Sequence, residues 1–230
     1  MKIDFTEQPK YFTYDNEAWY ASSFKPEYIS YILNYEPNVI FEFGSFNGGD
    51  ALKYKLGFPK SEVYTFEASP TLFKSASRTK KYGVKCFNYA ISNYDGNTSF
   101  YKSLNLTTDE EVGGGSLLKV TDEIKRNTST GIFSEKPDTI KCITISTFCK
   151  QHNITNIDFM HIDVEGVSKE VIEGFGTIRP KLIFVELILT EFSHIGGSKS
   201  KEVEEMLFNM GYEFLATNGN DNLYKLKELK

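Results

Sequence analysis

The residues best suited to do chemistry in this chain are acids and glycines that follow short apolar runs. The run VIFEF at residues 39–43 contains Glu42, and the segment GSFNGGD follows it, which gives the pattern E-x-G-x-x-x-G. Small residues let a backbone turn sharply and approach a ligand closely. The pattern is neither G-x-G-x-x-G nor the phosphate-binding G-x-x-x-x-G-K-[ST]. It therefore favours a ligand that lacks a pyrophosphate.

A second acid indicates that this ligand is a nucleoside. Glu67 ends the run VYTFE at residues 63–67, and a ribose-binding acid is expected roughly 20 residues after such a glycine loop. A carboxylate can accept hydrogen bonds from both ribose hydroxyls. S-adenosylmethionine fits the glycine spacing better than NAD, and its cationic groups suit the acid at Glu42. A third apolar run, which ends near Ala90, is the place for adenine contacts.

A third set of candidates lies at the end of the apolar run at residues 157–164. Asp163 and Glu165 share one face if the strand continues that far. Methyl transfer to an alcohol needs a base within hydrogen-bonding reach of the hydroxyl. Asp163, Glu165 and His194, which lies in a later loop, are the candidates for this base. Asp163 and Glu186 together could bind a divalent cation such as Mg²⁺, which would acidify the hydroxyl directly.

Structural roles compete with several of these assignments. The glycine loop could be an ordinary tight turn between a strand and a helix. Glu165 could be a helix N-terminal acid that complements the helix dipole. For His161, a hydrogen-bonded core histidine is favoured over a base.

A parallel sheet is needed to bring these strand ends together. Apolar runs at 39–43, 63–67, 84–91, 139–145, 157–164 and 181–189 alternate with helical patterns at 49–57, 70–83, 146–152, 167–174 and 199–210. This alternation predicts a Rossmann-like α/β fold, with a mostly parallel sheet and helices on both faces. Two last runs, at 212–216 and 223–227, predict an antiparallel hairpin that adds one antiparallel strand at the edge.

We expect residues 1–230 to form a single domain. Residues 1–25 are rich in tyrosine and phenylalanine and are expected to lie over the ligand-binding edge of the sheet. Residues 102–138 are expected to form a variable loop that chooses the acceptor, and the glycines at 113–115 could be the hinge of a lid.

Composition excludes some partners. The net charge of -5 argues against nucleic acid, because phosphate binding needs a basic face. No run of 18 apolar residues and no signal-like N-terminus is present, so we expect no membrane insertion and a cytoplasmic location. A homodimer is compatible with the chain.

The combination of these motifs resembles the FkbM family of class I methyltransferases. The resemblance runs from about Val39 to Leu189 and includes the segments EFGSFNGGD, FEASP, AISNYDGNTSFY, TISTFCKQ and IDVEG. It implies the seven-stranded methyltransferase sheet, S-adenosylmethionine as cofactor, and O-methylation of a small molecule or a glycan (sugar) acceptor. Members commonly carry lysine where this chain has His161, so the resemblance assigns that position no role.

The resemblance also implies roles for particular residues. Asp163 would lie beside the methionine end of the cofactor. The other implied cofactor contacts are Glu42, Gly44, Ser45, Phe46, Asn47 and Gly48 in the glycine loop, Glu67 and Ala68 at the ribose, and Ala90 and Ile91 at the adenine.

Three alternatives remain open at this point. An NAD(P)-dependent oxidoreductase would need the G-x-G-x-x-G pattern, which is absent. A non-catalytic nucleoside-binding module would be indicated by loss of the acids at the strand ends, but those acids are present. An N- or C-methyltransferase could use the same cofactor half, because that half does not determine the acceptor.

Overall fold

The computed structural model describes residues 10–119, 132–187 and 197–227. Its largest element is a seven-stranded sheet in the order β13-β14-β12-β11-β3-β4-β5. The strands are β3 (Val39–Phe43), β4 (Glu62–Phe66), β5 (Lys85–Phe87), β11 (Phe159–Ile162), β12 (Leu182–Glu186), β13 (Tyr212–Asn218) and β14 (Asp221–Leu226). Neighbouring strands are parallel except where β14 is involved. This is the mostly parallel sheet that the sequence predicted.

The C-terminal hairpin joins the sheet differently from the prediction. The sequence predicted one antiparallel strand at the edge, whereas β14 lies inside the sheet, between β12 and β13. The helix α7 (Gly197–Asn209) carries the chain away from the end of β12 before β13 begins. The hairpin then returns β14 into the space between β12 and β13, so β13 forms the edge.

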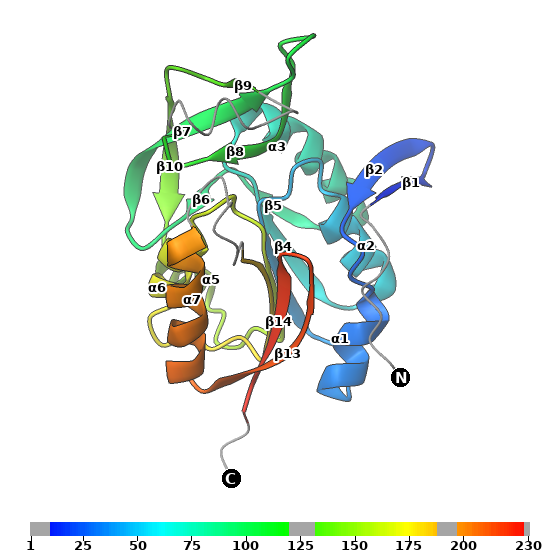
Figure 1. Cartoon of the computed structure of the whole chain (residues 1–230). Coiled ribbons are helices and arrows are strands. Elements are labelled where there is room, and N and C mark those ends of the chain that lie inside the picture. The colour runs from blue at the N-terminus through cyan, green and yellow to red at the C-terminus, as the bar shows by residue number, and fades with distance from the viewer. Residues whose placement is uncertain (1–9, 120–131, 188–196, 228–230) are drawn as a thin grey trace.

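Helices cover both faces of the sheet (Figure 1). They are α1 (Pro26–Leu33) and α2 (Gly49–Gly57) on one face, and α5 (Ile145–His152), α6 (Ser168–Glu173) and α7 on the other. Side chains alternate along each strand, so one strand supplies both cores. On β3, Ile40 packs with residues of α1 and α2, whereas Phe41 packs with residues of α5, α6 and α7. None of the described helices has the length and apolar character needed to span a membrane.

The helix after β4 begins as its sequence predicted. Ser69 caps α3 (Pro70–Ala76) by accepting hydrogen bonds from the backbone N–H groups of Thr71 and Leu72, and Pro70 occupies the first turn. A 3-10 helix (Ser77–Tyr82) continues α3 and ends at Gly83. The cap fixes the backbone immediately after Glu67, which matters for the site below.

A second, smaller sheet lies beside the carboxyl ends of the main sheet (Figure 1). Its strands are β6 (Ala90–Ile91), β7 (Gly96–Leu104), β8 (Glu111–Ser116), β9 (Ile132–Phe133) and β10 (Asp138–Ile143). The single strand predicted at 84–91 is therefore two: β5 pairs with β4, and β6 pairs with β10. Much of the segment predicted as a loop at 102–138 is strand in β7, β8 and β9 where the structure describes it.

The N-terminal segment forms a hairpin of β1 (Lys10–Tyr14) and β2 (Glu17–Ala21), which packs against α2. The Tyr20 backbone N–H donates to the Asn47 side chain at 3.3 Å. Residue 49 must be glycine here, because a Cβ at that position would lie 1.9 Å from the Tyr20 carbonyl oxygen.

At the opposite end of the strands, one buried carboxylate holds three elements together. Asp158 accepts hydrogen bonds from the backbone N–H groups of Asn38 (2.7 Å) and Val39 (3.1 Å) and from Lys181 Nζ (2.9 Å). Although burial opposes it, the Lys181 ammonium and these N–H groups hold the pKa of Asp158 below its ordinary value. Asp158 thereby fixes the starts of β3, β11 and β12.

We predict that Asp158→Ala lowers the free energy of unfolding by about 2 kcal/mol, because it leaves two part-buried backbone N–H groups and the Lys181 ammonium without their acceptor. Urea denaturation measures this change. The control is Asp138→Ala, which removes a carboxylate that is 44% exposed and paired with Lys102; it should cost less than about 1 kcal/mol. Equal losses in the two variants would contradict the role given to Asp158.

Candidate functional site

A cleft of about 880 Å³ opens at the carboxyl ends of β3, β4, β11 and β12. The small sheet contributes one wall through Phe100 and the glycines at 113–115, and the N-terminal hairpin contributes Tyr11 and Tyr20. The volume lies within the ordinary range for small-molecule and cofactor sites, about 300–1,000 Å³. Ligands of open α/β sheets bind at this end of the strands.

The glycine loop after β3 passes directly against β11. Gly44 has φ +80°, and a Cβ there would lie 1.6 Å from the carbonyl oxygen of Asp163. The Gly44 N–H donates to the Phe66 carbonyl at 3.0 Å, and the Asp163 N–H donates to the Phe43 carbonyl at 3.0 Å. Only glycine fits this position, so the loop is fixed between β4 and β11.

The next two residues face the cleft. Ser45 is only 4% exposed and lines the cleft, and its Oγ has no hydrogen-bond partner within the described part of the chain. A buried hydroxyl without a partner is costly unless a ligand satisfies it. Phe46 adopts φ +50°, and its ring meets Tyr20 edge to face. The loop therefore offers an unused hydroxyl to a ligand, beside an aromatic wall.

Glu67 is buried in the cleft after β4. Its two carboxylate oxygens accept hydrogen bonds from the backbone N–H groups of Phe46 (2.8 Å) and Ser69 (2.9 Å). Burial raises the pKa of Glu67 to about 7. Each oxygen still has acceptor capacity, so the carboxylate can receive two hydroxyl hydrogens of a ribose. The Asn88 side chain donates to the Glu67 carbonyl at 2.7 Å and holds the turn in place.

Acids gather on the other side of the cleft, at the ends of β11 and β12 and the start of β14. Asp163, Glu165 and Glu186 each bring a carboxylate oxygen within 4.8 Å of the others. Burial, followed by repulsion from Glu186 and Glu165, raises the pKa of Asp163 well above its ordinary range. Burial and the neighbouring Glu186 raise the pKa of Glu165 to about 7.

Asp221 completes this acidic group, which we call the acidic wall: Asp163, Glu165, Glu186 and Asp221. On the antiparallel pair β12–β14, Glu186 lies directly opposite Asp221, and both line the cleft. Like charges in that relation destabilise a sheet. Burial and Glu186 raise the pKa of Asp221 to about 7, and burial raises that of Glu186.

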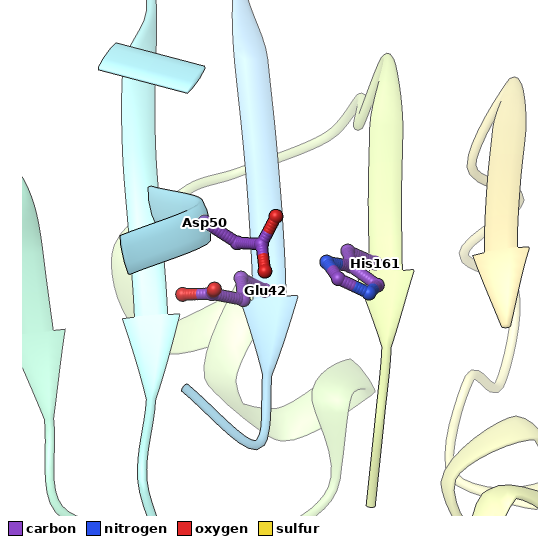
Figure 2. Close-up of side chains that lie close together, drawn as sticks. All are labelled: Glu42, Asp50 and His161. Atoms are coloured by element: carbon purple, nitrogen blue, oxygen red, sulfur yellow. The ribbon is translucent and has the colours of Figure 1, made fainter. Parts of the chain in front are cut away.

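A second polar cluster lies at the base of the cleft, where Glu42, Asp50 and His161 approach one another from β3, α2 and β11 (Figure 2). Glu42 is 2% exposed; it accepts hydrogen bonds from the Thr65 hydroxyl and the Ala51 N–H, and burial raises its pKa to about 8.

Asp50 and His161 also form hydrogen bonds within the protein. Asp50 accepts hydrogen bonds from the Ser22 N–H (2.8 Å) and hydroxyl (2.7 Å) and from Lys53 Nζ (2.5 Å). His161 Nδ1 lies 3.2 Å from the Tyr54 hydroxyl, and burial lowers the pKa of this histidine to about 4. The expected hydrogen-bonded core histidine is thus what the structure contains.

The structure brings most of the predicted site residues into one cleft. The predicted residues that line it are Gly44, Ser45, Phe46, Glu67, Ala68, Ala90, Ile91, Asp163, Glu165 and Glu186. Glu42, Asn47 and Gly48 do not line it: Glu42 and Asn47 bond to the backbone, and the Gly48 Cα faces Ala76 and Thr79. Their hydrogen bonds and packing support the loop, and their contact with a cofactor stays a prediction. His194 lies outside the described residues.

Two acids that line the cleft, Asp50 and Asp221, were not predicted from the sequence. Asp50 follows the glycine loop directly, so its place near the cleft could have been read from the motif. Asp221 stands in the turn region of the C-terminal hairpin, and only the pairing of β14 with β12 brings it to Glu186. No local sequence signal gives that register.

Comparison with known proteins agrees with this geometry. Residues 34–214 match the family model described as "Methyltransferase FkbM domain". The chain is 25% identical, over 162 residues, to a 2-O-methyltransferase, NoeI, of Sinorhizobium fredii; the match covers 67% of this chain and 63% of that relative. The chain thus spans less than two thirds of that relative's length.

Solved structures show the same fold. A Staphylococcus aureus protein provisionally described as a caffeoyl-CoA O-methyltransferase superposes with a TM-score of 0.50 at 12% identity, covering 88% of this chain and 80% of that one. An identity this low shows the fold alone. It confirms the predicted class I methyltransferase arrangement.

We predict that Asp221→Asn stabilises the protein, and more so at high pH. The pKa of Asp221 is raised from 3.8 to about 7 in the folded protein, so its ionisation destabilises the fold progressively as the pH rises from about 4 to about 7. The variant should exceed the wild type by at least about 1 kcal/mol at pH 8, and this advantage should shrink toward pH 4.

Urea denaturation at pH 4, 6 and 8 measures the difference. Glu213→Gln, at an exposed position of β13, makes the same charge change outside the cleft and should show no such trend. An advantage of Asp221→Asn that is independent of pH would contradict the repulsion described for the acidic wall.

Proposed function

Because the chain belongs to the FkbM methyltransferase family, we propose that it transfers a methyl group from S-adenosylmethionine to a hydroxyl oxygen of a small acceptor, and that this acceptor is a sugar or a similar polyol. The observation that carries the proposal is one cleft with two unlike halves. A nucleoside-type half contains Ser45 and Glu67, and the acidic wall faces it.

The first half fits the cofactor on three points. Gly44 lines the cleft, and its loop packs closely against β11 because no Cβ is present there. The unpartnered Ser45 hydroxyl can donate to a carboxylate. Glu67 keeps acceptor capacity for two ribose hydroxyls, and Ala90 and Ile91 supply an apolar surface for a base.

The acidic wall supplies what an acceptor hydroxyl needs. When bound, S-adenosylmethionine provides an electrophilic methyl group on a sulfonium sulfur. The work left to this chain is to hold the acceptor oxygen in line with that methyl group and to remove its proton. A pKa of about 7 suits Glu165 for proton removal near neutral pH, since a base is most effective when its pKa is close to the working pH.

Separate observations support the two parts of the proposal, that the methylated atom is an oxygen and that the acceptor is a sugar. The similar protein of Sinorhizobium fredii is named a 2-O-methyltransferase. Carboxylates accept hydrogen bonds from hydroxyl groups, and four such groups in one wall suit a molecule with several hydroxyls. Asp163 and Glu186 could hold Mg²⁺ as well, since both belong to a carboxylate group of suitable spacing.

We predict that S-adenosylhomocysteine raises the thermal midpoint of the protein and that NAD does not. At 100 times its dissociation constant, a ligand stabilises the native state by about 2.7 kcal/mol. Glu67→Gln should bind the thioether at least about tenfold more weakly, because an amide lacks the charge and half the acceptor capacity of a carboxylate.

The matched control is Glu62→Gln, at the far end of β4, where the carboxylate is exposed and pairs with Lys85. It should bind S-adenosylhomocysteine like the wild type. A midpoint shift with NAD and none with the thioether would overturn the methyltransferase proposal and favour an oxidoreductase.

We predict that the rate of methyl transfer rises with pH through about 7, because Glu165 must be ionised to accept a proton. Glu165→Gln should reduce kcat by about 10²–10⁴-fold while leaving the dissociation constant of S-adenosylhomocysteine within about threefold. The measurement is initial rate against pH, with the methylated product identified by mass spectrometry. Loss of cofactor binding in parallel with loss of rate would assign Glu165 a structural role instead.

A further inference from the structure

The N-terminal hairpin carries two exposed tyrosines to which the proposed chemistry gives no role. Tyr11 of β1 and Tyr20 of β2 lie directly opposite each other, and both line the cleft. Their side chains are 67% and 37% exposed. The next pair along the hairpin, Phe12 and Trp19, lies on its other face, because side chains alternate along a strand. Trp19 is fully buried, so the hairpin packs one face against the protein and leaves two phenol rings open to the cleft.

These rings continue an aromatic surface that begins in the glycine loop. The Tyr20 ring contacts both Phe46, at 6.1 Å between centroids, and Tyr11, at 5.1 Å. We call these three residues the aromatic strip. Phe46 adopts φ +50°, which is unfavourable for a bulky side chain. Such backbone strain is found mainly at active sites and ligand-binding sites, so the strip has the character of a binding surface.

The strip runs from the reaction site outward. Burial, followed by the neighbouring Tyr11 and Asp163, raises the pKa of Tyr20, so its hydroxyl stays protonated near neutral pH and lies within electrostatic reach of Asp163. Asp163 belongs to the acidic wall, where the proposed function places the acceptor hydroxyl. Tyr11 is the more exposed ring and lies nearer to solvent.

Backbone contacts fix Tyr20 against the glycine loop. Its N–H donates to the Asn47 side chain at 3.3 Å, and its carbonyl oxygen occupies the space that a Cβ at Gly49 would need. Two residues later, Ser22 donates to Asp50 through its N–H at 2.8 Å and its hydroxyl at 2.7 Å. A surface held in place before binding loses little conformational entropy when a ligand covers it.

The geometry of the two tyrosine rings fits two sugar rings better than one flat ligand. The ring planes of Tyr11 and Tyr20 are inclined at 59°, so a single planar ring system cannot lie on both. Successive pyranose rings of a glycan can twist about the glycosidic bond, and their spacing is close to the 5.1 Å between these centroids. A pyranose presents C–H groups on its faces and hydroxyls at its rim, which suits a tyrosine, with its apolar ring and polar hydroxyl.

We infer that Tyr20 and Tyr11 form two successive sugar subsites, and that the acceptor is therefore a glycan of at least two sugar residues. The residue over Tyr20 receives the methyl group, and the next residue stacks on Tyr11. This inference rests on the proposed function, because it names the acceptor class of the same site.

Calorimetric titration of the protein saturated with S-adenosylhomocysteine tests the inference. The probes are the methyl glycosides of glucose, mannose and galactose, each paired with that of its disaccharide: maltose, mannobiose and galactobiose. In at least one pair the disaccharide should bind at least about tenfold tighter than the monosaccharide, which corresponds to about 1.4 kcal/mol. Burial of roughly 55 Å² of apolar surface supplies that difference.

Variants locate the preference. Tyr11→Ala should reduce the preference for the disaccharide to below about threefold, because it removes the second ring surface. Tyr11→Phe keeps the ring and should keep most of the preference. The control is Tyr31→Ala, which removes an exposed tyrosine of α1 outside the cleft lining and should bind both sugars like the wild type. Circular dichroism of each variant shows that the protein tested is folded.

Three results would overturn the inference. Every disaccharide could bind no tighter than its monosaccharide, or fail to bind at all. The preference could survive in Tyr11→Ala. Catechol could bind tighter than every sugar, which would assign the strip to a flat aromatic acceptor. If S-adenosylhomocysteine itself fails to bind, the proposed function fails separately, and the same titrations without it still decide whether the cleft holds two sugar subsites.

Discussion

The site depends on one steric constraint, the contact between Gly44 and the backbone of Asp163. A side chain at position 44 would occupy the place of the Asp163 carbonyl oxygen, at 1.6 Å. Because none is present, the end of β3 approaches the end of β11 closely enough for the Asp163 N–H to bond to Phe43. This contact sets the distance between the loop that fits a cofactor and the first acid of the opposite wall.

Hydrogen bonds near both ends of the strands hold the sheet and its neighbouring elements in place. At the far end, Asp158 fixes the starts of the strands through backbone hydrogen bonds. At the near end, Asp50 binds Ser22 and Lys53, and the N-terminal hairpin is held against α2. The stabilising carboxylates are therefore those with N–H or ammonium partners. Among the described residues that line the cleft, no lysine or arginine pairs with the acids of the wall, so the fold carries their repulsion.

Most of the fold, and the cleft residues at the ends of β3, β4 and β11, could be predicted from the sequence for a physical reason. The strand ends and the glycine loop are local features: apolar periodicity, a cap at Ser69 and small residues at 44 and 48 each act within a few positions. The split of the run at 84–91 and the place of β14 inside the sheet are set by pairing between distant strands. Nothing local in the sequence of β6 or β14 indicates which strand it pairs with.

The same distinction explains why the position of Glu42 outside the cleft lining and that of Asp221 within it were not predicted. An acid at the end of a strand can face either the ligand or the helix that follows, and its sequence position is the same in both cases. The Glu42 carboxylate accepts hydrogen bonds from the Ala51 N–H of α2 and from the Thr65 hydroxyl of β4. Asp221 comes from a distant hairpin and reaches the cleft only because β14 runs antiparallel to β12. The half of the cleft that we assign to the cofactor comes from strand ends that local patterns predict, whereas the acidic wall also depends on the pairing of β14 with β12.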